Sequence, residues 1–257
     1  MGFITYYKSR YEEKSTFIWK LLIMLCSIAL CIVRYPNIRR TFYKGGCAKD
    51  VITVFSHIYM FPLLVILCTE LFLFLSYKDN NSNVVLRYGS RKRIWLYQCL
   101  AGVLYSLECV LIIYITALLF GYWFHGTYDN WQVPGSYFYT MMKNKNMPVD
   151  YGLSDFQIYL ITLLIQWFIM ALMMMVGLLL EYITGELRVA ILGIVLSCGI
   201  DTVKGHFVIG TFEIKPLDYF NVSGCVTKIL GALAAVVIVI LIGIKISRYR
   251  QYYKKVE

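Results

Sequence analysis

The chain has 257 residues, of which 59% are apolar and 16% charged, and its formal net charge is +10. Its mean hydropathy of +0.63 is well above the value expected for a soluble domain of this length. This composition excludes a water-soluble globular enzyme and predicts an integral membrane protein. No motif for DNA or RNA binding accompanies the positive charge. Many of the basic residues lie next to the ends of apolar runs, where they anchor a protein to anionic membrane lipid.

Residues 1–16 predict an amphipathic helix that lies on the inner membrane surface before the first span. Apolar and charged side chains recur there at helical spacing. The apolar positions are Phe3, Ile4, Tyr7 and Tyr11, and the charged ones are Lys8, Arg10, Glu12 and Lys14. The apolar run that follows ends without a small-residue cleavage pattern, so we expect it to be retained as a membrane anchor.

Six apolar runs each predict a membrane-spanning helix. A span needs about 20 mainly apolar residues, and backbone groups that face lipid must be satisfied within the segment, which favours helices. The expected spans are 17–33, 51–76, 95–124, 156–183, 187–209 and 226–246, with the upper boundary of the fifth left open. The predicted fold class is therefore all-α, with residues 1–257 forming a single transmembrane domain.

The distribution of Lys and Arg predicts which side the termini occupy. With an even number of spans, both termini lie on the same side of the membrane. Placing them in the cytoplasm puts 15 of the 25 Lys and Arg residues on the inner side. Because inner loops carry the excess of basic residues, we expect cytoplasmic termini.

The connection at 77–93, which reads YKDNNSNVVLRYGSRKR, is a short basic interruption between two long apolar runs. It contains an apolar patch of Val84, Val85, Leu86 and Tyr88, and Gly89 is placed where a short helix ends in the left-handed conformation. The patch predicts a docking surface for a soluble partner. The alternative is an anchoring loop whose arginines meet lipid headgroups.

The string RYGSRKRIW at 87–95 resembles the loop between spans two and three of type-2 ABC transporter permeases, especially small ones from Gram-positive bacteria. The resemblance implies an N-terminal elbow helix, six spans, a coupling helix in this loop and a place in the bacterial plasma membrane. It implies that a separate ABC ATPase binds ATP and Mg and that two permease copies, identical or homologous, form the exporter. The ATPase-coupling residues implied are Val84, Val85, Leu86, Arg87, Tyr88, Gly89, Ser90 and Arg91.

No motif in the chain predicts chemistry of its own. No GxxxxGK[ST] phosphate loop occurs, so this chain does not hydrolyse ATP by that route. The three histidines, His57, His125 and His206, form neither an HExxH helix nor a pair four residues apart. The run at 181–188 lacks the adjacent glutamates of intramembrane proteases, and GxSxG is absent. We therefore expect a non-enzymatic subunit without a cofactor or metal.

Three carboxylates fall within the expected spans, where ionisable groups are costly and often mark a pathway. Glu108 lies about thirteen residues into the third span, which predicts a position near mid-bilayer. Glu70 and Glu181 fall near the inner boundary. Each is a candidate pathway residue, and the alternative is a structural partner for a Tyr or Arg.

The segment 199–225 mixes glycines and charges with apolar residues and predicts a re-entrant segment on the outer side. Most of the eight cysteines lie within spans, and no CxxC pair occurs. Cys47 and Cys225 fall in expected outer loops, and both a disulfide and two separate thiols are consistent with the sequence.

The favoured function is the permease subunit of an ABC exporter, and the resemblance points to a peptide or an amphiphilic antimicrobial as its substrate. The alternative is a non-transporting membrane sensor or assembly scaffold whose inner loop binds a signalling partner. A secondary transporter is disfavoured because the two halves show no inverted repeat.

Overall fold

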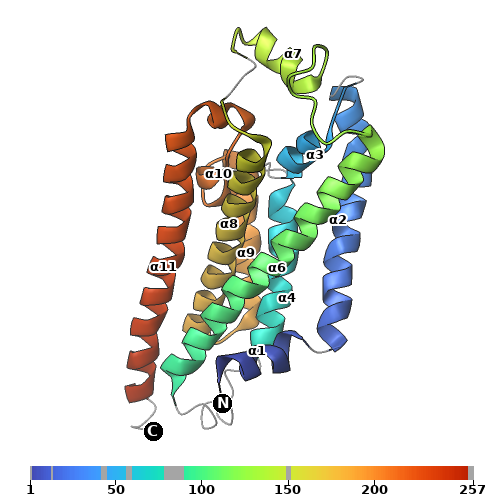
Figure 1. The fold of residues 1–257 in the computed structure, drawn as a ribbon. Helices are drawn as coiled ribbons and strands as arrows, with labels where there is room; N and C mark the ends of the chain where they lie inside the picture. Colours follow the sequence, from blue (N-terminus) through green and yellow to red (C-terminus); the bar gives the residue numbers. More distant parts are fainter. Residues whose placement is uncertain are drawn as a thin grey trace.

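The computed structural model describes residues 2–12, 14–41, 45–55, 60–77, 90–148 and 152–253, and within these ranges it contains helices and no strand. The all-α prediction is confirmed for them. The long helices form one bundle (Figure 1): α2 (Lys14–Thr41), α4 (Phe61–Tyr77), α6 (Arg91–His125), α8 (Asp155–Thr184), α9 (Leu187–Lys204) and α11 (Val222–Tyr253). The short elements are α1 (Phe3–Tyr11), α3 (Ala48–Phe55), α7 (Tyr137–Asn144), α10 (Ile209–Phe212) and the 3-10 helix η2 (Pro216–Phe220).

Among the described helices, four are long and apolar enough to cross a membrane, namely α2, α6, α8 and α11. Helix α4 is apolar but has 17 residues, and the 18 residues of α9 include Arg188, Asp201 and Lys204. Large apolar side chains such as Leu230 and Leu241 of α11 point outward and are exposed. These helices fit a multi-pass membrane protein.

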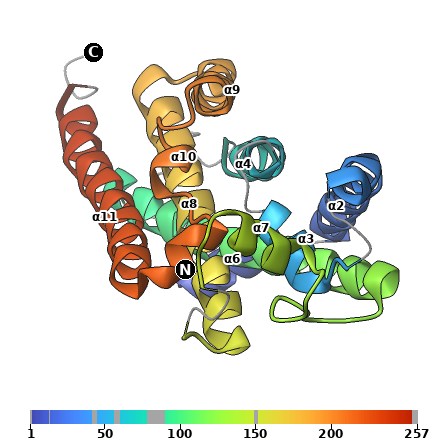
Figure 2. The same ribbon diagram turned by 90° about the horizontal axis from the view of Figure 1, so that it is seen from above.

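Helix α8 is the most enclosed of the four. In its most apolar stretch 61% of the residues are buried, compared with 22% in α2 and 17% in α11. Seen from above, α2 and α11 lie on opposite sides of the bundle with α6 and α8 between them (Figure 2). The hydrophobic core therefore forms around α8 and the oblique helix α6.

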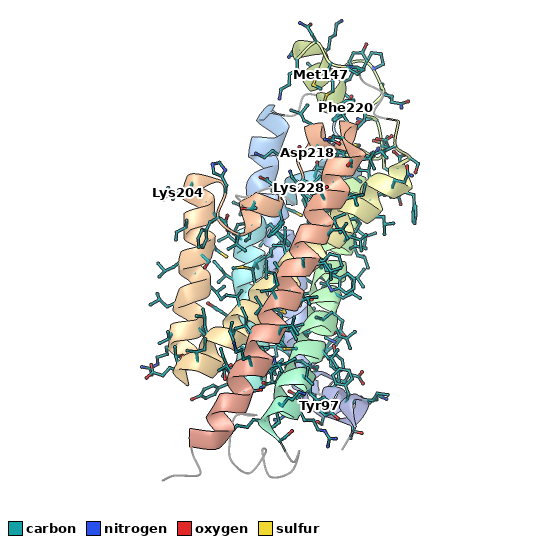
Figure 3. The ribbon with its side chains drawn as sticks, turned by 90° about the vertical axis from the view of Figure 1, so that its left-hand side faces the viewer. Tyr97, Met147, Lys204, Asp218, Phe220 and Lys228 are labelled. Atoms are coloured by element: carbon teal, nitrogen blue, oxygen red, sulfur yellow. The ribbon has the colours of Figure 1, made fainter. Side chains whose placement is uncertain are left out.

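The bundle has two different ends (Figure 1). Both chain termini, α1, the end of α4 and the start of α6 lie at one end, which we name the termini end. Helices α3, α7 and α10 lie at the other, which we name the α7 end. Figure 3 shows Tyr97 at the termini end, whereas Asp218 and Lys228 lie toward the α7 end.

The expected second span, 51–76, is not one described helix. Its first part belongs to α3 and its remainder to α4, and residues 56–59 between them lie outside the described residues. Helix α3 packs on α6. Gly121 of α6 permits the close approach, because a Cβ atom there would lie 2.7 Å from the Cα atom of Ala48.

The expected fifth span, 187–209, was too long at its upper boundary, since α9 ends at Lys204. Gly205 follows with φ +79°, a left-handed conformation that glycine adopts without steric cost. The buried carboxylate of Asp201 then accepts hydrogen bonds from the backbone N–H groups of residues 207, 208, 209 and 210, at 2.8 to 3.0 Å. One aspartate thus supplies the acceptors that a continuing helix would have provided.

The segment 199–225 consists of the end of α9, α10, η2 and the start of α11. Lys228 of α11 holds it together: its Nζ donates to the backbone oxygen of Glu213 and pairs with Asp218 Oδ2, both at 2.7 Å. Structural partners are thus present for Asp201, Glu213, Lys215 and Asp218. Its depth in a membrane stays a prediction.

We expect Gly121→Ala to destabilise the protein, because the added methyl group meets the backbone of α3 and overpacking costs about 1 to 3 kcal/mol. The matched control is Gly199→Ala in α9, where an added Cβ meets nothing within 4 Å. That change should leave the midpoint of thermal unfolding in detergent unchanged or slightly higher, since alanine favours helix. Equal effects of the two substitutions would contradict the close α3–α6 contact.

Candidate functional site

Of the expected ATPase-coupling residues, Ser90 and Arg91 lie at the termini end, where α6 begins. The other six lie outside the described residues, namely Val84, Val85, Leu86, Arg87, Tyr88 and Gly89. Ser90 is described and caps α6: its Oγ accepts a hydrogen bond from the backbone N–H of Arg93 at 3.2 Å. Arg91 is the first residue of the helix. The structure thus describes the joint at the start of α6, where residues 90 and 91 enter the bundle.

Trp95 attaches the first turns of α6 to two other helices. Its ring is fully buried, and its Nε1 donates to the backbone oxygen of Ile240 in α11 at 3.1 Å. The ring also contacts Tyr182 of α8, with centroids 5.4 Å apart. A Cβ atom at Gly243 of α11 would collide with the indole, so glycine is needed at this crossing. A displacement of the start of α6 therefore acts directly on α8 and α11.

Gln98 ties the two flanks of the 78–89 connection together. Its Nε2 donates to the backbone oxygen of Ser76, near the end of α4, at 3.3 Å, and both residues are buried. On another side, Phe3 and Tyr6 of α1 pack on Tyr97, with ring centroids 5.8 and 5.7 Å apart. The joint therefore includes α1 and α4 as well as α8 and α11.

Glu108 forms a polar contact that joins three helices. Tyr7 of α1 donates its hydroxyl to Oε1 at 2.7 Å, and Lys20 of α2 pairs with Oε2 at 2.7 Å. Burial, and next the hydrogen bond to Glu108, raise the pKa of Tyr7 above its ordinary value, so the phenol stays a proton donor. Of the two readings that the sequence left open, the contacts describe a carboxylate with structural partners.

The membrane depth expected for Glu108 stays a prediction. Its partners lie on α1 and near the start of α2, which belong to the termini end.

Helix α1 is inserted into the bundle by its tyrosines rather than confined to the surface. Tyr6, Tyr7 and Tyr11 are buried. Tyr11 stacks on Phe72 of α4 at 5.9 Å and contacts Tyr105 of α6 at 5.6 Å between ring centroids. Of the apolar positions expected on this helix, Tyr7 and Tyr11 are covered by the bundle, whereas Ile4 is exposed.

The other two candidate pathway residues lie on different helices. Glu70 is half-buried on α4, and Glu181 is buried on α8 near its termini end. A pathway role for Glu70, Glu108 and Glu181 stays a prediction. No group of three or more His, Cys, Asp or Glu that could hold a metal occurs among the described residues.

A second polar cluster, which the sequence did not single out, lies at the α7 end around Lys49 of α3. The Lys49 side chain is fully buried. Its Nζ pairs with Asp129 Oδ1 at 2.7 Å and with Asp155 Oδ1, and it lies 4.7 Å from the centroid of the Trp131 ring. One cation thus joins α3, the chain that follows α6 and the first turn of α8.

Asp50 extends this cluster. Its carboxylate accepts hydrogen bonds from Trp131 Nε1 at 2.7 Å and from the backbone N–H of Cys47 at 3.0 Å. Burial raises the pKa of Asp50 to about 6, although these two donors oppose the shift. Backbone hydrogen bonds of 3.1 Å also join Ala48 to Thr127 and Lys49 to Tyr128. Side chains and backbone therefore hold α3 against the segment after α6.

Cys47 and Cys225 are two separate thiols. The Cys47 thiol contacts Asp50 Oδ2 at 3.4 Å, whereas Cys225 Sγ donates to the backbone oxygen of Asp218 at 3.3 Å. Burial, and next the charge of Asp50, raise the pKa of Cys47 to about 12. This thiol is therefore unreactive while it stays enclosed.

No motif in the sequence singled out Lys49 or Trp131. A local signal was present, because Lys49 and Asp50 stand directly before an apolar run, and Asp129 and Asp155 lie near the two ends of the connection between the apolar runs 95–124 and 156–183. Their pairing could not be deduced, since it depends on how α3 packs against α6.

Comparison with known proteins gives no relative: no family model, no curated protein and no solved structure matches this chain.

We expect the protein to become more stable as the pH falls from about 7 to about 5, by roughly 1 kcal/mol from Asp50 alone. The pKa of this carboxyl is higher in the folded state than in the unfolded chain, so the folded state binds the proton more tightly between about pH 4 and about pH 6. Stability is lost as the pH rises through this window. The midpoint of thermal unfolding should show this trend, and Asp50→Asn should reduce it. An unchanged trend in Asp50→Asn would contradict the assignment.

Proposed function

We propose that this chain is the permease subunit of an ABC exporter, with six spans that include α2, α4, α6, α8, α9 and α11. In this proposal a separate ATPase binds ATP and Mg and docks on the segment that precedes α6. Two permease copies, identical or homologous, complete the exporter. A peptide or an amphiphilic antimicrobial is the proposed substrate class, and this part rests on the family resemblance alone.

The observation that carries the proposal is the joint at the start of α6. The string at 87–95 contains Ser90, the helix cap, and Trp95, and Gln98 follows three residues later in α6. These two side chains bond α6 to α11 and to the end of α4 within the first turns of the helix. A segment that receives force from a closing ATPase needs such a rigid attachment, because a flexible one would absorb the movement.

The charges of the described residues support cytoplasmic termini. Basic residues at the termini end occur on five helices, namely α1 (Lys8, Arg10), α2 (Lys14, Lys20), α6 (Arg91, Lys92, Arg93), α9 (Arg188) and α11 (Lys245). At the α7 end, Lys49, Lys215 and Lys228 each pair with a carboxylate, whereas Lys143 and Lys145 are exposed. The number of basic residues on these five helices favours the termini end as the cytoplasmic one.

The proposal assigns Arg93 to the cytoplasm and Lys145 to the outside, and both side chains are exposed. We expect a membrane-impermeant maleimide to label Lys145→Cys in intact cells and to label Arg93→Cys only after permeabilisation. The wild-type chain, whose cysteines are buried or half-buried, gives the background. The opposite pattern would refute the orientation and, with it, the docking of a cytoplasmic ATPase.

We expect the chain, purified in mild detergent from its native membranes, to bring with it a protein that carries a phosphate-loop ATPase sequence. Leu86→Glu should reduce this co-purification by about tenfold or more, because it places a charge in an apolar contact. Arg87→Glu should also reduce it, by reversing a charge at the rim.

Val133→Glu is the matched control, since it makes the same kind of change at an exposed position at the α7 end. It should leave the amount of bound ATPase unchanged. ATPase binding that survives both Leu86→Glu and Arg87→Glu would contradict the docking of an ATPase on this segment. The absence of any ATPase in the wild-type sample would favour the sensor or scaffold function.

A further inference from the structure

We propose that Lys49 is the central cation of a latch that holds the α7 end of the bundle closed. The latch consists of Lys49, Asp129, Trp131 and Asp155. Its role as the gate through which substrate leaves rests on the proposed function, whereas the latch itself is a property of this fold.

The latch joins three segments that lie far apart in the chain, and backbone hydrogen bonds from Ala48 and Lys49 also link the first of them to the second. Lys49 is in α3, Asp129 and Trp131 lie in the chain between α6 and α7, and Asp155 opens α8. The ammonium group contacts both carboxylates and lies over the indole. Any separation of α3 from the start of α8 at this end must break at least one of these contacts.

Because Lys49 is buried, the closed state of the latch depends strongly on the two carboxylates that pair with it. The Lys49 side chain is excluded from water, so its charge is tolerable only while the carboxylates compensate it. The carboxylates differ from it, since the side chains of Asp129 and Asp155 are 29% and 51% exposed. Both acids can be hydrated where they stand, but Lys49 gains water only if the end opens. This asymmetry favours two discrete states, closed with all contacts or open and hydrated.

Trp131 links the latch to the elements that cover this end. Its ring stacks on Phe138 of α7 with centroids 4.0 Å apart and contacts Tyr219 of η2 at 6.3 Å. Tyr219 is hydrogen-bonded in turn to Thr162 of α8 at 2.7 Å. Releasing Lys49 would therefore loosen the contacts that hold α7 and η2 over the bundle.

Helix α6 connects the latch to the joint at the opposite end. Ser90 caps its first turn, and Gly121 lies against Ala48, beside Lys49, near its last turn. A displacement of the start of α6 is carried along one continuous helix to the surface on which α3 packs. The latch is thus placed to respond to the segment where the ATPase is proposed to dock.

The reaction of Cys47 with a maleimide shows whether the latch is closed or open. It is fully buried beside Asp50, and burial raises the pKa of its thiol to about 12, so it reacts with a maleimide only when this end opens. Cys99 of α6, which is also buried, lies near the termini end and reports on general unfolding.

The test compares labelling of the native cysteines by a membrane-impermeant maleimide in lipid nanodiscs, with each site quantified by peptide mass spectrometry. Lys49→Met keeps the length of the side chain and removes its charge. We expect it to raise the labelling rate of Cys47 by about tenfold or more, because it removes the contacts that join α3 to Asp129 and Asp155 and leaves these two carboxylates, which met at one ammonium group, to repel each other. Labelling of Cys99 should not change. Lys143→Met, the same substitution at an exposed lysine of α7, should leave both rates at wild-type values.

A second set of variants separates the latch from simple loss of stability. Asp129→Asn combined with Asp155→Asn should also raise Cys47 labelling, because the buried ammonium group of Lys49 then loses both carboxylates that balance its charge. Adding Lys49→Met to these two substitutions should lower the labelling rate again, because it removes that unbalanced charge. The proposal is overturned if Cys47 labelling stays at the wild-type rate in Lys49→Met, or if Cys99 labelling rises in parallel. It is also overturned if the triple variant is labelled faster than the double variant.

These outcomes do not depend on the ATPase. Should an ATPase co-purify while Cys47 labelling is insensitive to Lys49, the latch fails and the proposed function stands. Should labelling respond as expected in a chain that binds no ATPase, the latch stands as a conformational device and the exporter proposal fails.

Discussion

The structure depends on one constraint, the length of α6. Its 35 residues extend over about 52 Å at about 1.5 Å per residue, whereas the apolar interior of a membrane is about 30 Å thick. A helix of this length must tilt and project beyond that interior, so it crosses the bundle obliquely and touches α1, α2, α3, α4, α8 and α11 on the way. Both candidate sites are built on it: Trp95 and Gln98 near its first turn, and the packing of α3 on Gly121 near its last. A single rigid element therefore connects the two ends of the protein.

The two ends of the bundle are held together by different kinds of interaction. At the termini end, α1 and the flanks of the 78–89 connection are held by aromatic packing and by single hydrogen bonds from buried side chains to backbone oxygens. Such contacts transmit displacement because close-packed groups resist compression. At the α7 end, a buried cation is balanced by carboxylates that remain partly in water. Charge balance of this kind favours discrete states, because a partly separated buried pair has neither its partner nor hydration. The first arrangement suits a lever and the second suits a latch.

Much of the fold could be predicted because hydrophobic length is a local property. The expected spans 95–124 and 156–183 lie within four residues of the ends of α6 and α8, whereas α2 and α11 extend eight and seven residues beyond the ends expected for their runs. The errors occurred where polar side chains replace helical hydrogen bonds. The carboxylate of Asp201 ends α9 earlier than hydropathy indicates, and no periodicity reveals that it caps a turn several residues away.

The sequence by itself determined the class of the protein, its helical content, the approximate extent of most long helices and the bias of basic residues toward one side. These follow from composition and from the cost of exposing backbone groups to lipid, which each segment meets alone. Only the tertiary structure decided that Lys49 meets Asp129 and Asp155, that Tyr7 and Lys20 share Glu108, and that Trp95 bonds to α11. These partners lie far apart in the chain, and their pairing depends on crossing angles and on close approaches at glycines such as Gly121 and Gly243. Such contacts arise from packing, which no local pattern of residues encodes.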